Sequence, residues 1–153
     1  MKRTLGAGLL LLCFAQVGEP QEKKPPKYKL TATDIAAEFV KNRDQAKRKF
    51  FPGPVIKDWA QGATVHVSGT LDRITSSKVV AKTGPGKTEE WTEYQFVLKT
   101  ATPFKVIVIS KKAPGDLKSK DPQIVEATGE FHRLEPRSVS IFAETVRILP
   151  VKK

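Results

Sequence analysis

The sequence VHVSGTL, residues 65–71, alternates between apolar and polar side chains. Neighbouring residues of a β-strand point to opposite faces, so this period of two predicts a strand with one buried face. Gly69 stands in the apolar row, where a glycine usually marks a bulge or a sharp bend. Small barrels turn their corners in this way, and we therefore expect a bent strand in a closed β-sheet.

Two further strands are expected from residues 79–81 and 91–98, paired across a turn-forming stretch at residues 84–87. Tyr94, Phe96 and Leu98 would then share the inner face of the second strand. The next segment, residues 104–109 (FKVIVI), is almost continuously apolar. Such a run predicts a strand that is covered on both sides.

The C-terminal part continues the period of two. A turn at residues 135–137 separates its two apolar rows, and the second row slips in phase near Glu144, which predicts a bulge. The rows are Val125, Ala127, Gly129 and Phe131, followed by Val139, Ile141, Val146 and Ile148. Five to six strands in about 120 residues predict a mainly β domain, a small antiparallel β-barrel. A two-sheet sandwich is the alternative.

One helix is expected before the strands. Thr31 can cap its start, and Asp34, three residues later, can return the bond to the backbone. The apolar stripe then recurs at spacings of three and four residues, which predicts about four turns ending at the Phe51-Pro52-Gly53-Pro54 stretch. The stripe consists of Ile35, Ala36, Phe39, Val40, Ala46 and Phe50.

The N-terminus has the pattern of an export signal. Residues 1–15 combine a basic start with a short apolar run, which predicts a cleaved signal peptide and a periplasmic or secreted protein. A lipid anchor on Cys13 is the alternative. Residues 16–29 are rich in Pro and Lys and are expected to form a flexible tether. The folded domain is then expected over residues 30–150, with a basic tail at 151–153 and no span that crosses a membrane.

Sequence motifs give little reason to expect catalysis, a metal or a cofactor. Cys13 is the only cysteine, which excludes an intrachain disulfide and a cysteine-rich metal site. The GPGKT stretch at residues 84–88 resembles a phosphate loop, but the glycine required five residues before Gly86 is Ala81, and a strand follows instead of a helix. His66 and His132 are expected on outward faces of separate strands, each without a nearby ligand partner.

The domain resembles a known family in three places: the helix with Phe39, Asn42 and the Phe50-Phe51 pair, the first strand at residues 65–74, and the terminal segments EATGEF and IFAE. On these residues it is similar to the tRNA-anti-like family of exported bacterial OB-fold proteins. The resemblance implies an OB-type barrel. The chain departs from the pattern at residues 52–62, an insertion of about ten residues before the first strand that includes Trp59.

The expected function is that of an exported binding module for another envelope or secreted macromolecule, with a protein as the favoured partner. The net charge of +11 keeps a second hypothesis open, a site for single-stranded nucleic acid or anionic polysaccharide. OB folds bind single strands by stacking bases on aromatic rings above a basic groove. The candidate residues for such a site are Trp91, Tyr94, Lys78, Lys82, Lys99 and Lys105. Of the aromatic side chains in this region, Trp91 is the least explained by the core.

Overall fold

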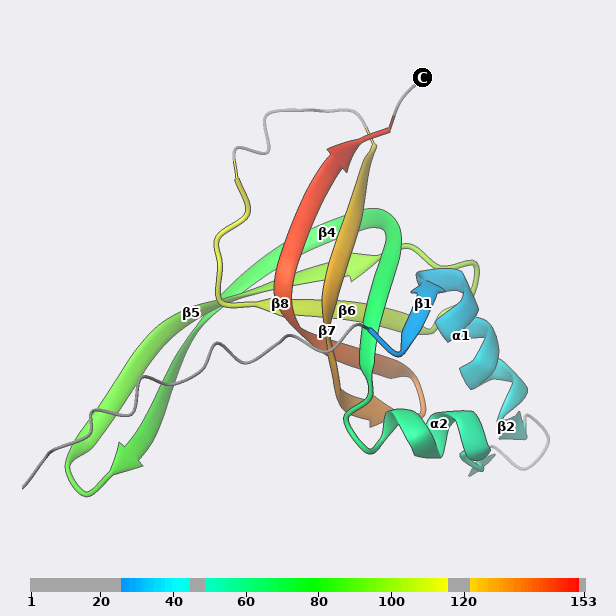
Figure 1. Ribbon diagram of the computed structural model, residues 1–153, viewed down its shortest axis with the longest axis horizontal. Helices are drawn as coiled ribbons and strands as arrows, with labels where there is room; N and C mark the ends of the chain where they lie inside the picture. Colours follow the sequence, from blue (N-terminus) through cyan, green and yellow to red (C-terminus); the bar gives the residue numbers. More distant parts are fainter. Residues whose placement is uncertain (1–25, 45–48, 116–121, 152–153) are drawn as a thin grey trace, which may run out of the picture.

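The computed structural model describes residues 26–44, 49–115 and 122–151, and it is mainly β (Figure 1). The predicted signal peptide, most of the predicted tether and Lys152-Lys153 lie outside these residues. In chain order the elements are β1 (Tyr28–Thr31), α1 (Ala32–Lys41), β2 (Arg43–Asp44), β3 (Lys49–Phe50), α2 (Pro54–Trp59), β4 (Thr64–Gly84), β5 (Lys87–Leu98), β6 (Lys105–Ser110), β7 (Gln123–Glu135) and β8 (Ser138–Pro150).

Five strands close into a ring. β4 pairs with β5, β5 with β6, β6 with β8, β8 with β7, and β7 again with β4. The predicted small closed sheet is therefore confirmed, but the sheet is mixed and not antiparallel throughout. After β6 the chain crosses to β4 and forms β7 there, so the β7–β8 hairpin brings β8 back beside β6 in the same direction.

β4 changes its pairing partner just after Gly69, where the sequence predicts a bend or bulge. β4 pairs with β7 from Thr64 to Thr70 and with β5 from Leu71 onward, with a bulge directly after Leu71. A Cβ atom at Gly69 would lie 2.9 Å from the Cβ of Ala32, at the start of α1. The glycine is therefore required by the close approach of the helix to the bent strand.

The second predicted bulge is confirmed at Glu144. Thr128 pairs with Thr145 and the next residue, Gly129, pairs with Ala143, so Glu144 is the extra residue. The inner rows of β4, β6, β7 and β8 form the core or pack against it as expected, with Leu71, Val146 and Ile148 only half-buried. The prediction that β6 is covered on both sides is wrong for its outer side. Ile107 and Ile109 are half-buried there, so the strand is fully covered on one face only.

The helix prediction is correct at its start and wrong at its end. Thr31 and Asp34 form the expected capping box. α1 ends at Lys41, because Asn42 takes over the C-cap and the chain turns into the short β2–β3 pair, which contains Phe50. Ala46 lies outside the described residues.

The domain also begins earlier than predicted. β1 precedes the helix and pairs in parallel with β4, Tyr28 with Val65 and Lys29 with His66. Tyr28 and Lys29 belong to the segment that its composition predicts to be a flexible tether. Strand pairing of this kind depends on the distant β4, and a short Lys-rich segment gives no sign of it.

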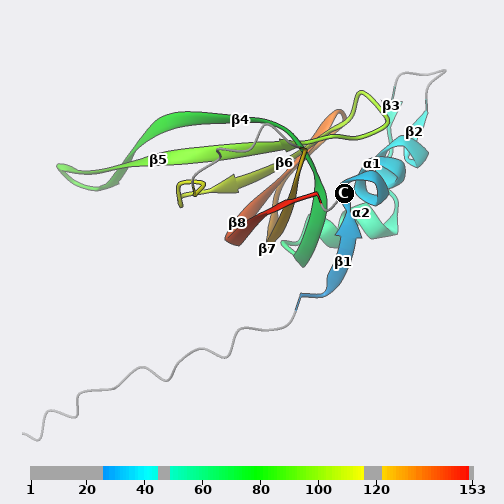
Figure 2. The ribbon, with the colours of Figure 1, turned by 90° about the horizontal axis from the view of Figure 1, so that it is seen from above.

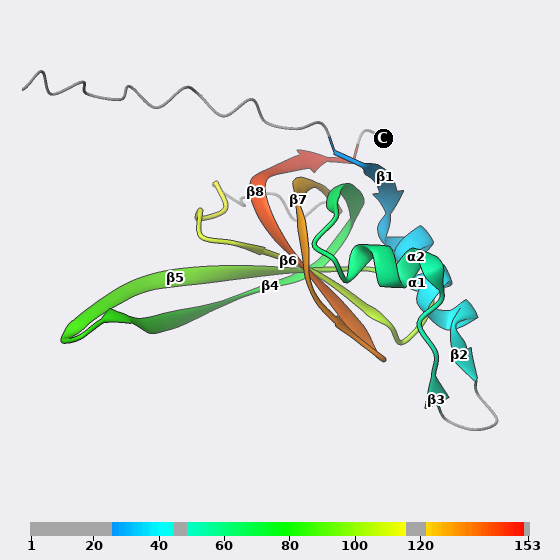
Figure 3. The ribbon, with the colours of Figure 1, turned by 60° about the horizontal axis from the view of Figure 1, so that its bottom comes forward.

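The insertion at residues 52–62 forms a second helix, α2, which the sequence did not predict. Trp59 at its end is 2% exposed and stacks on Phe131, with ring centroids 4.8 Å apart. Its ring also lies beside that of Phe39 of α1, with ring centroids 6.1 Å apart. α1 and α2 lie together on one side of the ring, opposite the projecting hairpin of β4 and β5 (Figure 3).

Candidate binding surfaces

The hairpin of β4 and β5 extends well beyond the ring (Figure 2). Among the described strands, residues 75–84 of β4 pair only with β5, and residues 87–93 of β5 pair only with β4. At about 3.3 Å per residue the ten residues of β4 reach about 33 Å. The two strands join at Pro85 and Gly86, where Gly86 has a φ of +72° as a type II turn requires. Residues 75–93 are called the arm below.

The register separates the predicted aromatic residues. Val79 is opposite Trp91, and Ser76 is opposite Tyr94. Because neighbouring residues alternate between faces, Trp91 and Tyr94 lie on opposite faces of the hairpin. Tyr94 continues the inner face and packs against the core, whereas Trp91 lies on the outer face.

Trp91 is held by polar neighbours rather than exposed as a bare ring. The ammonium of Lys111 lies over it, 4.1 Å from the ring centroid, and its Nε1 donates to Glu93 at 3.1 Å. This cation–π contact comes from the segment after β6. Sequence reasoning missed Lys111, because its place beside Trp91 depends on the β5–β6 register, which is known only from the structure.

The four predicted lysines do not join Trp91 in one groove. Lys78 and Lys82 lie on the opposite face of the arm, and Lys78 forms an ion pair with Glu90 at 3.6 Å. Lys99 follows β5 and borders a shallow hollow of about 230 Å³ near the start of α1. Lys105 lies at the start of β6, in a different cleft.

This cleft has a volume of about 530 Å³, and no prediction included it as a site. Its floor is apolar and includes Phe39 and Phe104, whose rings stack with centroids 4.3 Å apart. Three cations surround it, Arg43 of β2, Lys105 of β6 and Arg137 of the β7–β8 turn. We call it the basic cleft. Its cations lie far apart in the sequence, so no linear motif reveals it.

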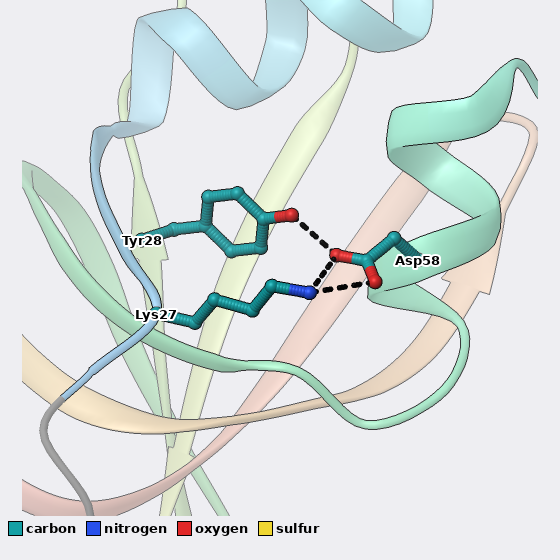
Figure 4. Close-up of polar contacts among 3 residues, drawn as sticks. All are labelled: Lys27, Tyr28 and Asp58. Atoms are coloured by element: carbon teal, nitrogen blue, oxygen red, sulfur yellow. Dashed lines mark hydrogen bonds and ion pairs between the residues drawn. The ribbon is translucent and has the colours of Figure 1, made fainter.

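A polar cluster connects β1 to α2 (Figure 4). The Lys27 ammonium lies 2.7 Å and 2.8 Å from the two carboxylate oxygens of Asp58, and the Tyr28 hydroxyl donates to the same carboxylate. The hydrogen bonds from Lys27 and, to a smaller extent, from Tyr28 lower the pKa of Asp58. The same bonds raise the pKa of Lys27 and of Tyr28. The three groups satisfy one another, which is the arrangement of a structural clamp.

The two histidines lie apart. His66 is half-buried and its Nδ1 lies 3.0 Å from the Thr128 hydroxyl, while His132 is exposed and packs edge-on against Phe142. Within residues 26–44, 49–115 and 122–151 there is no group of three or more side chains able to hold a metal ion. No helix in the same part of the chain has the length and apolar character needed to cross a membrane.

Comparison with known proteins found no matching family model, no matching curated protein and no matching solved structure. Membership of the tRNA-anti-like family therefore stays a prediction from the residues quoted above.

Proposed function

We propose that this chain is an exported, non-catalytic binding module that recognises another protein through the arm. The observation that carries the proposal is the arm itself, a two-stranded hairpin with both backbone edges unpaired among the described strands. An isolated hairpin of this kind is marginally stable in water. Its free edges are also templates for pairing with a strand of another chain.

The charges of the arm favour a protein over a polyanion. Residues 75–93 contain three lysines and three glutamates, so the arm carries no net charge. Binding of a nucleic acid or a sulfated polysaccharide depends on several cations that neutralise phosphates or sulfates together. Here the glutamates lie on the same strand as Trp91, and its ring is already covered on one side by Lys111. An aromatic residue with polar surroundings is instead compatible with a protein interface, whose core is enriched in aromatic side chains and whose rim is polar.

The arm can be shortened without disturbing the ring, which allows a direct test. Lys78 and Thr92 are register partners, so an Asn-Gly turn in place of residues 79–91 closes a shorter hairpin. We expect the purified chain to retain an envelope protein at physiological salt, and the shortened chain and Trp91→Ala to lose it. The matched control is Val80→Ala, on the opposite face and 63% exposed. Retention that is unchanged by arm shortening would contradict the proposal.

The nucleic-acid and polysaccharide hypothesis is tested in the same series. Labelled single-stranded DNA, RNA and heparin fragments are titrated at low and physiological salt and followed by anisotropy. We expect any binding to disappear at physiological salt and to be indifferent to Trp91→Ala, as for diffuse attraction. Binding that survives salt and falls with Trp91→Ala would favour the polyanion site instead.

Export is a separate part of the proposal and needs its own measurement. If residues 1–15 form a cleaved signal, N-terminal sequencing of the exported protein will begin at Gln16. Mass spectrometry that finds a lipid on Cys13 would favour an anchored protein. A chain that keeps Met1 and stays inside the cell would contradict export in both forms.

A further inference from the structure

The basic cleft is a second binding site, and we propose that it binds a phosphate monoester attached to an aromatic or other apolar group. The site is independent of the arm and of the function proposed for it. α1 and β2, which supply part of its lining, lie on the side of the ring away from the arm (Figure 1).

The charge of the cleft is one-sided. Arg43, Lys105 and Arg137 line it together, and none of the described residues of its lining is acidic. None of the three has an acidic ion-pair partner among the described residues, whereas Lys27, Lys41, Lys78 and Arg133 all do. An anion bound between these cations would gain charge-assisted hydrogen bonds, and a guanidinium can bind two phosphate oxygens at once.

The apolar lining of the basic cleft indicates a ligand that has an apolar part as well as an anionic group. Phe39 and Phe104 form the back of the cleft and are almost fully buried, so the apolar surface open to a ligand is that of Val40, which is 37% exposed, and of two prolines. These prolines, Pro103 and Pro136, complete the apolar part of the lining. Apolar surface of this kind gains free energy only when a ligand covers it, so the matching ligand carries an apolar body as well as the phosphate.

The cleft is also held in shape before any ligand arrives. The amide of Lys105 donates to the carbonyl of Arg137 at 3.0 Å, and Lys105 is in register with Ser138 across the parallel β6–β8 pair. The backbone at two of the three cations is therefore held in place by the β6–β8 pairing and the bond beside it. A volume of about 530 Å³ lies within the range of small-molecule sites.

The test uses 1-naphthyl phosphate as the probe, titrated into the full chain by calorimetry. We expect inorganic phosphate and 1-naphthol, each of which supplies half of the recognition, to bind at least about tenfold more weakly. Arg43→Gln, Lys105→Gln and Arg137→Gln are each expected to weaken binding of the probe on the order of tenfold. The matched control is Lys87→Gln, an equal loss of charge at the exposed start of β5 in the arm.

A second pair of variants separates the site from the total charge of the protein. Val40→Glu places an anion in the cleft and should abolish binding of the probe. Val55→Glu changes α2 outside the cleft, at a residue of similar exposure, and should not affect it. Absence of probe binding, equal binding of inorganic phosphate, or an effect of Lys87→Gln as large as those in the cleft would each overturn the proposal. Urea midpoints equal to wild type establish that the variants are folded.

Discussion

Replacing Gly69 by alanine tests how closely the helix packs against the bent strand. The new Cβ would lie 2.9 Å from the Cβ of Ala32 and 3.1 Å from the Leu98 Cδ1, where ordinary contacts are 3.4–4 Å. Strand pairing holds β4, and the capping box holds the start of α1, so neither side moves freely. Overpacking of this kind costs about 1–3 kcal/mol, and the lower unfolded-state entropy of alanine offsets about 0.4–1 kcal/mol of it.

The assay is urea denaturation followed by tryptophan fluorescence, since Trp59 is buried beside the same helix. With a slope of about 1–3 kcal/mol per molar urea, the midpoint of Gly69→Ala should fall by roughly 0.5–1 M. Gly84→Ala is the matched control, because a Cβ there meets no atom within 4 Å. Its midpoint should stay within experimental error of wild type or rise slightly.

A double-mutant cycle with Ala32→Gly isolates the contact itself. Ala32→Gly destabilises the helix on its own by about 1 kcal/mol. In that background, however, the clash with position 32 is gone, so Gly69→Ala should cost about 1 kcal/mol less than in the wild type. The reasoning is refuted if the cost is the same in both backgrounds, or if Gly69→Ala is as neutral as Gly84→Ala.

Three further outcomes follow from the same contacts. Trp59→Ala empties the space beside Phe131 and should destabilise the protein by about 3–5 kcal/mol in urea denaturation, far more than truncation of Trp91 on the arm. Asn42→Ala removes a side chain that accepts a hydrogen bond from the Gly53 amide at 2.6 Å, and it should lower the free energy of unfolding by about 1–3 kcal/mol. A loss of stability below about 0.3 kcal/mol would show that water replaces this bond. Because the pKa of Asp58 is lowered in the folded protein, its contribution to stability is present above its ordinary pKa of about 4. This contribution is lost as the pH falls through the pKa of the folded state. Thermal unfolding of the wild type should therefore lose more stability below about pH 4 than that of Asp58→Asn, and parallel pH profiles would contradict the clamp.

Local patterns in the sequence determined much of the fold. The period of two located the inner rows of the sheet, since one side of each strand must be apolar. The bend at Gly69, the turn at residues 84–87 and the bulge at Glu144 were also found, because each leaves a mark within a few residues. The capping box at Thr31 belongs to the same class of signal.

Tertiary structure decided what depends on distant partners. β1 joins β4 through a pairing of segments far apart in the chain, and the helix stops at Lys41 because Asn42 caps it and the chain turns into the β2–β3 pair. Residues three apart on one strand point to opposite faces, so the sequence alone places Trp91 and Tyr94 on opposite faces. The ammonium of Lys111 that lies over the Trp91 ring comes from another segment, and only the tertiary structure shows it. The basic cleft is the clearest case, since its three cations come from residues 43, 105 and 137 and meet only when the ring has closed. A sequence records the spacing of neighbours, whereas a site of this kind is a distance between segments, and that distance exists only in the folded chain.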